Sequence, residues 1–228
     1  MRRSFALVVV ICIFASPPSE AQLEKYRVKP TSSEARIDEE WAIYAVTLRE
    51  VTRSTDGPNA LWRSKITRIE EGDSAKFRFE DGTLSALWFF TPDGPWAQIK
   101  NTSQRTLVIA WDRSALVDRS GTSHRLVSSH TTYAAKNAVQ PPIAIPPGAK
   151  ISEALIPADA IVLGSNGREI EPILPRKVTV RTDSTGSFIT SRQMIGDTLK
   201  VLLPVEIGDQ QFEYLFEFVV EGVFVGNR

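Results

Sequence analysis

The stretch TLKVLLPVEIGDQQFEYLFEFVVEGVFV, residues 198–225, decides the fold. Both halves are rich in β-branched and aromatic residues, and a Gly208-Asp209-Gln210 turn separates them. In the second half, aromatic residues recur at every second position, which places them on one face of a strand. They are Phe212, Tyr214, Phe216 and Phe218. The pattern predicts an antiparallel hairpin whose second strand turns an aromatic face toward the core.

Shorter β-prone runs precede this hairpin. KITRIEE (65–71) and AKFRFED (75–81) alternate apolar and polar residues, which predicts a second hairpin with one solvated face. LSALWFF (84–90), WAQIK (96–100) and RTLVIAW (105–111) are more continuously apolar. Runs of that kind are typical of inner strands that are covered on both sides.

The sequence therefore predicts an all-β protein, specifically an immunoglobulin-like antiparallel β-sandwich of roughly eight to ten strands. The sandwich is expected over residues 41–228, with 22–40 as a polar N-terminal lead. Two small β units divided near residue 95 are the alternative. The polar segment 182–197 allows a short helix.

The first twenty-one residues have the features of a secretory signal peptide. A basic start at Arg2 and Arg3 precedes an apolar run from Phe5 to Ala15, and Ser19-Glu20-Ala21 is a small-x-small cleavage site. The run is shorter than the roughly 20 residues needed to cross a bilayer. We expect export to the periplasm or the exterior, with no transmembrane segment in the mature chain.

Composition limits the chemistry. Cys12, inside the predicted signal peptide, is the single cysteine, so the mature chain has no thiolate nucleophile and no disulfide. Two histidines without cysteines do not make a zinc site, and no cofactor-binding motif occurs. Equal numbers of basic and acidic residues, 27 each, argue against nucleic acid as a partner.

Residues 101–125 resemble a hydrolase site in residue types alone. Asp112, Ser114, Asp118, Ser123 and His124 supply acids, nucleophiles and a base. A catalytic serine needs a strained elbow and oxyanion donors, and no G-x-S-x-G occurs in the chain. We therefore assign no catalytic residue and interpret Asp118 and His124 as a pair that stabilises a hairpin.

The segment HTTYAAKNAVQPPIAIPPGAK, residues 130–150, is the candidate binding surface. Its two Pro-Pro pairs stiffen the chain without allowing a helix. An amphipathic tyrosine and three side chains with adaptable hydrogen bonding lie within it. They are Tyr133, Lys136, Asn137 and Gln140. The alternative is that the segment only connects two sheets.

Several segments resemble a broad group of uncharacterised bacterial envelope proteins with immunoglobulin-like domains, many of them lipoproteins. They are FEDGTLSALW (79–88), Asn101-Thr102-Ser103, IAWDRSALVDRSGTSHRLV (109–127), IPPGAK (145–150) and EYLFEF (213–218). The resemblance covers residues 77–228 and implies a fold without a known activity. The chain departs from the lipoproteins because Ile11 precedes Cys12, where they have Gly, Ala or Ser.

The sequence thus favours a non-catalytic binding or assembly module of the bacterial envelope, with an envelope protein or polymer as partner. A hydrolase that acts on envelope polymers through carboxylates is the alternative. A purely structural protein that stiffens a larger complex is a third possibility.

Export with cleavage after Ala21 predicts a mature chain that begins at Gln22. Intact-mass measurement of the protein from its native envelope should give the mass of residues 22–228. A diacylglyceryl group on Cys12 would instead identify a lipoprotein.

Overall fold

The computed structural model describes residues 36–55, 64–71, 74–183, 186–189 and 194–226. The predicted signal peptide, with its cleavage site and Cys12, and residues 22–35 of the predicted lead lie outside the described residues. The antiparallel all-β prediction is confirmed, because apart from turns and loops the described part forms antiparallel strands and one short 3-10 helix.

Sixteen strands follow one another along the described part of the chain. Their bounds are β1 (Arg36–Thr55), β2 (Lys65–Glu71), β3 (Ser74–Glu80), β4 (Leu84–Thr91), β5 (Gly94–Asn101), β6 (Leu107–Ile109), β7 (Ala115–Val117), β8 (Ser123–Ser128), β9 (Ile143–Ile145), β10 (Lys150–Pro157), β11 (Ile161–Gly164), β12 (Gly167–Ile170), β13 (Lys177–Asp183), β14 (Gly186–Ile189), β15 (Thr198–Ile207) and β16 (Gln210–Gly226). The 3-10 helix η1 (Trp111–Arg113) lies between β6 and β7.

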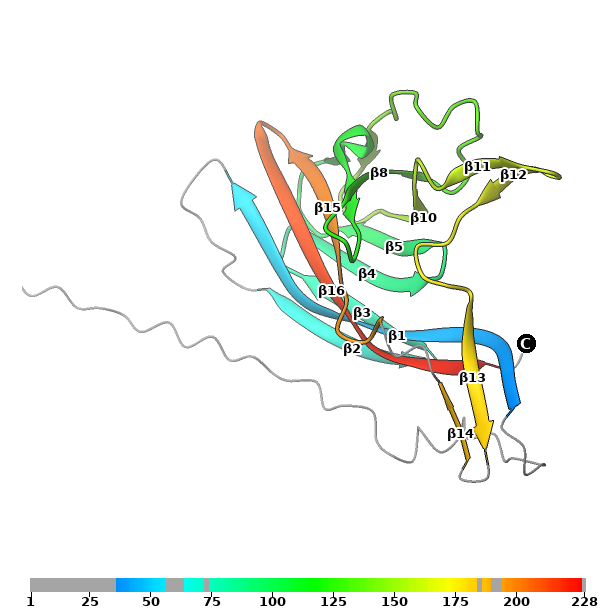
Figure 1. The fold of residues 1–228 in the computed structure, drawn as a ribbon. Helices are drawn as coiled ribbons and strands as arrows, with labels where there is room; N and C mark the ends of the chain where they lie inside the picture. Colours follow the sequence, from blue (N-terminus) through cyan, green and yellow to red (C-terminus); the bar gives the residue numbers. More distant parts are fainter. Residues whose placement is uncertain (1–35, 56–63, 72–73, 184–185, 190–193, 227–228) are drawn as a thin grey trace, which may run out of the picture.

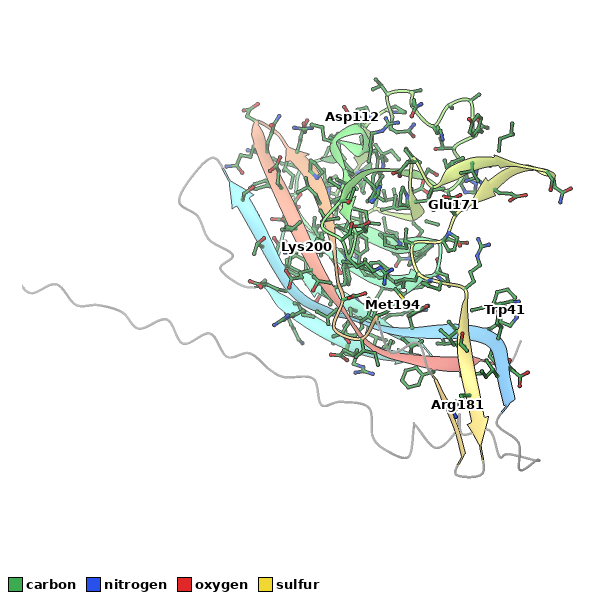
Figure 2. All side chains as sticks on the ribbon, viewed as in Figure 1. Trp41, Asp112, Glu171, Arg181, Met194 and Lys200 are labelled. Carbon is green, nitrogen blue, oxygen red and sulfur yellow. The ribbon has the colours of Figure 1, made fainter. Side chains whose placement is uncertain are left out.

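Nearly all strands belong to one curled sheet, a half-barrel whose inner face encloses the core (Figure 1). The hydrogen-bonded order is β14-β13-β1-β16-β15-β7-β8-β10-β5-β4-β3-β2, and β6 and β9 extend it beside β15. The β11–β12 hairpin stands apart as a two-stranded sheet. In Figure 2, Trp41 and Arg181 lie at the β13 end of the molecule, and Asp112 lies at the opposite end.

The long strand β1 provides much of the curvature. It pairs first with β13, over residues 36–41, and then with β16 along the rest of its length. Its register with β16 shifts between Ala45 and Val46 and again between Leu48 and Glu50. Such irregularities bend a strand and increase its twist. β1 begins at Arg36, inside the segment predicted as a polar lead.

The C-terminal hairpin forms as predicted, from β15 and β16. Its turn is two residues long, because Ile207 already pairs with Gln210. Gly208 has a φ of +58°, the left-handed conformation that a tight hairpin turn requires and that glycine adopts without strain.

The aromatic face of β16 forms the centre of the core. The Phe216 ring lies 5.6 Å from the Phe79 ring of β3 and 4.8 Å from the Trp88 ring of β4, and Phe218 lies 4.7 Å from Phe90. The contacting rings of β3, β4 and β16 come from different parts of the hydrogen-bonded path. The sheet therefore curls so that strands far apart in this order, β16 and the pair β3 and β4, pack on each other through aromatic rings.

A buried polar cluster joins the same two regions. Arg53 of β1 donates to Asp81 in the β3–β4 turn at 3.0 Å, and the Tyr214 hydroxyl of β16 donates to the same carboxylate at 2.7 Å. The backbone N–H groups of Thr83 and Leu84 donate to the other oxygen of Asp81. Burial, together with the charge of Asp81, raises the pKa of Tyr214, which keeps its hydroxyl as a donor.

The β4–β5 hairpin continues through the position proposed as a division between two units. Residue 95 pairs with Phe90 inside this hairpin. Gly94 next to it has a φ of +152°, and a Cβ there would collide with the backbone carbonyl of Leu155 in β10. Glycine therefore permits close approach between β10 and the β4–β5 hairpin.

The polar segment 182–197 contains a strand where the sequence allowed a helix. Residues 186–189 form β14, which pairs antiparallel with the end of β13. Residues 184–185 and 190–193 lie outside the described residues, and after them the N–H of Asp197 bonds to the carbonyl of Met194 at 3.1 Å and closes a turn. Pairing with the neighbouring strand decides the conformation here, which local composition does not reveal.

Removal of the Asp81 charge should destabilise the fold strongly. The side chain of Asp81 is 2% exposed and that of Arg53 17%, so Asp81→Asn leaves a largely buried guanidinium without its counter-charge. We expect a loss of about 3 kcal/mol in the free energy of unfolding, measured by urea denaturation.

Asp93→Asn is the matched control, because the Asp93–Arg176 ion pair is 38% and 43% exposed. Such a pair contributes less than about 1 kcal/mol. Equal losses of unfolding free energy in the two variants would show that Asp81 does not hold β1 and β16 against the β3–β4 turn.

Candidate functional site

The predicted binding segment, residues 130–150, contains the short strand β9 and reaches the start of β10. Its first part is an ordered series of turns at one end of the molecule, over residues 129–142 between β8 and β9, and we call this part the 129–142 connection. Successive turns are closed by backbone bonds from Thr131 to Ser128, from Ala135 to Thr132 and from Ala138 to Ala135. The 129–142 connection is therefore compact although it contains no regular element.

Basic side chains clamp this connection to the body of the protein. The Arg125 guanidinium donates to the carbonyl of Ala138 at 2.8 Å and also to the carbonyl of Lys136. The Lys136 ammonium donates to the carbonyl of Ile161 in β11 at 2.7 Å, and Arg168 of β12 donates to Ser129 at 2.6 Å. Both ends of the connection are thus fixed to neighbouring strands.

The four predicted binding residues occupy different environments in this connection. Tyr133 is 43% exposed, and the Lys136 ammonium lies 4.7 Å from the centre of its ring. Asn137 is exposed. Gln140 is half-buried and lines an adjacent groove. The structure thus brings Tyr133 and Lys136 together and places Gln140 at the groove.

The groove has a volume of about 190 Å³. Its lining combines apolar side chains with a few polar ones from η1, β8, β9, β10 and the connection. The residues are Trp111, Ser128, Gln140, Pro141, Ile143, Glu153 and Leu155.

Sequence reasoning identified Gln140 among these lining residues and missed the others. Trp111, the last residue of the apolar run 105–111, is 5% exposed and belongs to the core, but it also lines the groove. Glu153 could have been noticed within KISEALIP, because it shares a strand face with Ile151 and Leu155. A charged residue on an otherwise apolar strand face is a signal of function.

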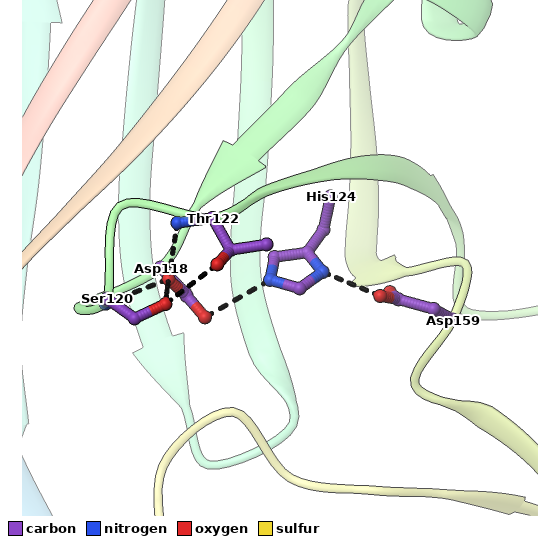
Figure 3. A network of polar contacts seen from close by, with 5 residues as sticks. All are labelled: Asp118, Ser120, Thr122, His124 and Asp159. Carbon is purple, nitrogen blue, oxygen red and sulfur yellow. Dashed lines mark hydrogen bonds and ion pairs between the residues drawn. The ribbon is translucent and has the colours of Figure 1, made fainter.

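The predicted contact between Asp118 and His124 is present, but His124 has a second acidic partner. Figure 3 shows the imidazole between two carboxylates: Nε2 lies 3.2 Å from Asp118, and Nδ1 lies 2.7 Å from Asp159. Asp118 also accepts bonds from Ser120 and from the backbone of Thr122. The cluster ties the β7–β8 turn to the β10–β11 turn.

This arrangement differs from a catalytic triad. Both ring nitrogens of His124 contact carboxylates, so neither is left to take a proton from a serine. Ser114 is 1% exposed and bonds to the carbonyl of Ala110, while Ser123 is exposed on β8. Asp112 lies in η1 and is exposed. Asp118 and His124 therefore come together without a serine, and the residues of 101–125 do not assemble a catalytic triad.

The positive imidazole and the negative carboxylates of the cluster stabilise each other's charged forms. Burial opposes the charged form of His124, but the hydrogen bonds and negative charges of Asp159 and Asp118 outweigh it and raise the pKa of the imidazole. Burial likewise opposes ionisation of Asp118, but bonds from Ser120, His124 and the Thr122 backbone lower its pKa to about 2. An imidazolium that donates to both carboxylates satisfies all three groups.

The described part of the chain offers neither a metal-ligand cluster nor a membrane-crossing helix. No group of three or more His, Cys, Asp or Glu residues there is arranged to hold a metal ion. No helix in the same residues is long and apolar enough to cross a membrane. No family model, curated protein or solved structure matches the chain.

The His124 cluster predicts a pH dependence of stability. Because the folded-state pKa of His124 is raised, its contribution is complete below the unfolded pKa of about 6.5 and disappears as the pH rises through the folded value. The difference in free energy of unfolding between wild type and His124→Gln should therefore be largest below pH about 6 and shrink toward alkaline pH. Urea denaturation across this range measures it.

His130→Gln serves as the control, since His130 is exposed. Asp159→Asn should reduce the pH dependence without abolishing it, because Asp118 remains on the other nitrogen. A wild-type to His124→Gln difference that stays constant with pH would contradict the charged cluster.

Proposed function

We propose that the protein is an exported, non-catalytic binding or assembly module of the bacterial envelope. Its contact surface is the 129–142 connection with the groove beside it, and its partner is an envelope protein or polymer. The proposal includes an immunoglobulin-like sandwich as the family architecture. The resemblance of residues 77–228 to envelope proteins and the packing of β16 on β3 and β4 support that part.

One observation carries the functional proposal: an irregular surface segment is held in a single conformation by bonds to its own backbone. Arg125, Lys136 and Arg168 all donate to main-chain carbonyls within or beside the connection. A recognition loop that is ordered before binding loses less conformational entropy when its partner arrives. Exposed Tyr133 and Val139, at 43% and 79%, supply apolar contact area on this ordered segment.

The carboxylate-dependent hydrolase has less support. A glycosidase places two carboxyl groups about 5–9.5 Å apart across its substrate. Glu153 is the one carboxylate among the residues that line the groove. The groove is also smaller than the roughly 300–1,000 Å³ of typical small-molecule sites.

The proposal predicts a loss of partner capture when the connection is altered. Tyr133→Ala combined with Lys136→Ala removes the exposed ring and the ammonium that lies over it. We expect capture of the partner from the native envelope fraction to fall about tenfold, since such anchors dominate interfaces. Quantitative pull-down with the tagged protein measures the effect. The thermal midpoint should fall only slightly, by the loss of the Lys136 bond to the Ile161 carbonyl.

The control is Ile37→Ala with Lys177→Ala at the opposite end of the molecule, where Ile37 is 69% exposed and the Lys177 side chain 52%. This variant should capture the partner as wild type does. Undiminished capture by the Tyr133 and Lys136 variant would exclude the connection as the contact surface.

A further inference from the structure

The groove beside the connection contains a carboxylate in an unusual position. Along β10, Ile151, Glu153 and Leu155 share one strand face by the period of two. Leu155 is 1% exposed within the core, and Ile151 packs against the core. Glu153 therefore extends from the core-facing side of the strand.

The Glu153 carboxylate has no counter-charge in the described part of the structure. Ser128 of β8 donates to it at 3.2 Å, and no ion pair with Glu153 forms among the described residues. Carboxylates that are removed from solvent are usually paired with a cation or with several hydrogen-bond donors. One hydroxyl satisfies a small part of the acceptor capacity of two carboxylate oxygens.

Apolar side chains surround this carboxylate. Trp111, Ile143 and Leu155 form walls of the groove, and Gln140 and Pro141 of the connection border it. An apolar wall that leads to one negative charge is complementary to a lysine or arginine side chain, whose aliphatic stem buries readily while its charge keeps a polar partner. A volume of about 190 Å³ is suited to one side chain rather than to a whole small-molecule ligand.

We infer that the groove receives one basic side chain of a protein partner, with the stem against Ile143 and Leu155 and the cationic head on Glu153. This inference rests on the proposed function and names the chemistry of its partner. The connection would then contact the partner around the inserted side chain, because Gln140 belongs to both the connection and the groove.

The test uses the isotope-labelled full-length mature protein and two capped tripeptides, Gly-Lys-Gly and Gly-norleucine-Gly. Norleucine keeps the aliphatic stem and lacks the charge. The lysine peptide should shift the NMR signals of the Glu153 and Leu155 amides and of the Trp111 indole N–H, which Trp111→Phe identifies. The norleucine peptide should bind about tenfold more weakly than the lysine peptide. Added salt should reduce the affinity of the lysine peptide, because the expected contact is an ion pair.

Glu153→Gln tests the charge itself. It preserves size and an oxygen acceptor for Ser128, and it should weaken binding of the lysine peptide about tenfold. Glu171→Gln, at an exposed site after β12, should leave binding unchanged (Glu171 is labelled in Figure 2). The thermal midpoint of Glu153→Gln should equal or exceed that of wild type, because the carboxylate has no cation to lose.

Three results would overturn the inference. Equal binding of the two peptides, or of wild type and Glu153→Gln, would show that charge does not guide recognition. A lowered thermal midpoint of Glu153→Gln would assign the carboxylate a structural role. Tighter binding of free 1,4-diaminobutane than of the lysine peptide would assign the groove to a small amine.

Partner capture separates this inference from the proposed function. Loss of capture by both Glu153→Gln and the Tyr133 and Lys136 variant supports the two together. If only the Tyr133 and Lys136 variant loses capture, the connection remains the contact surface and the groove assignment is overturned.

Discussion

The rest of the structure depends on the packing of one strand's aromatic face against two strands from the other end of the sheet. Phe216 and Phe218 of β16 contact rings from β3 and β4, and these contacts hold the curl that encloses the core. Without them the antiparallel ladder would expose one apolar face along its whole length. The Arg53–Asp81–Tyr214 cluster makes this packing specific. Its hydrogen bonds fix where β1 and β16 meet the β3–β4 turn.

Features set by neighbouring residues were predictable from the sequence. The β15–β16 hairpin, its aromatic face and the β2–β3 pair follow from alternation and turn residues a few positions apart. β1 escaped prediction, although it is the longest strand. Its curvature comes from register shifts against β16, and the two strands are far apart in the chain.

Contacts over long sequence separations explain what was missed at the candidate sites. The Asp118–His124 pair spans a single turn and was expected, whereas Asp159 reaches the same imidazole from the β10–β11 turn. Gln140 was selected for its side-chain chemistry, and its neighbour across the groove, Glu153, comes from another strand. Alternation within β10 does mark Glu153 as out of place, but only the assembled sheet shows that a groove opens there.

The double pairing of β10 has a consequence for how the molecule opens. Residues 150–154 pair with β5, and residues 155–157 pair with β8, so β10 is the strand that links β2–β5 to the rest of the described sheet. Detachment of this strand divides the hydrogen-bonded path in two. Amide exchange along β10 therefore reports cooperative opening of the whole sheet rather than fraying of one hairpin. Any molecule seated against Glu153 and Leu155 contacts that strand, and its binding free energy then protects the entire fold from unfolding.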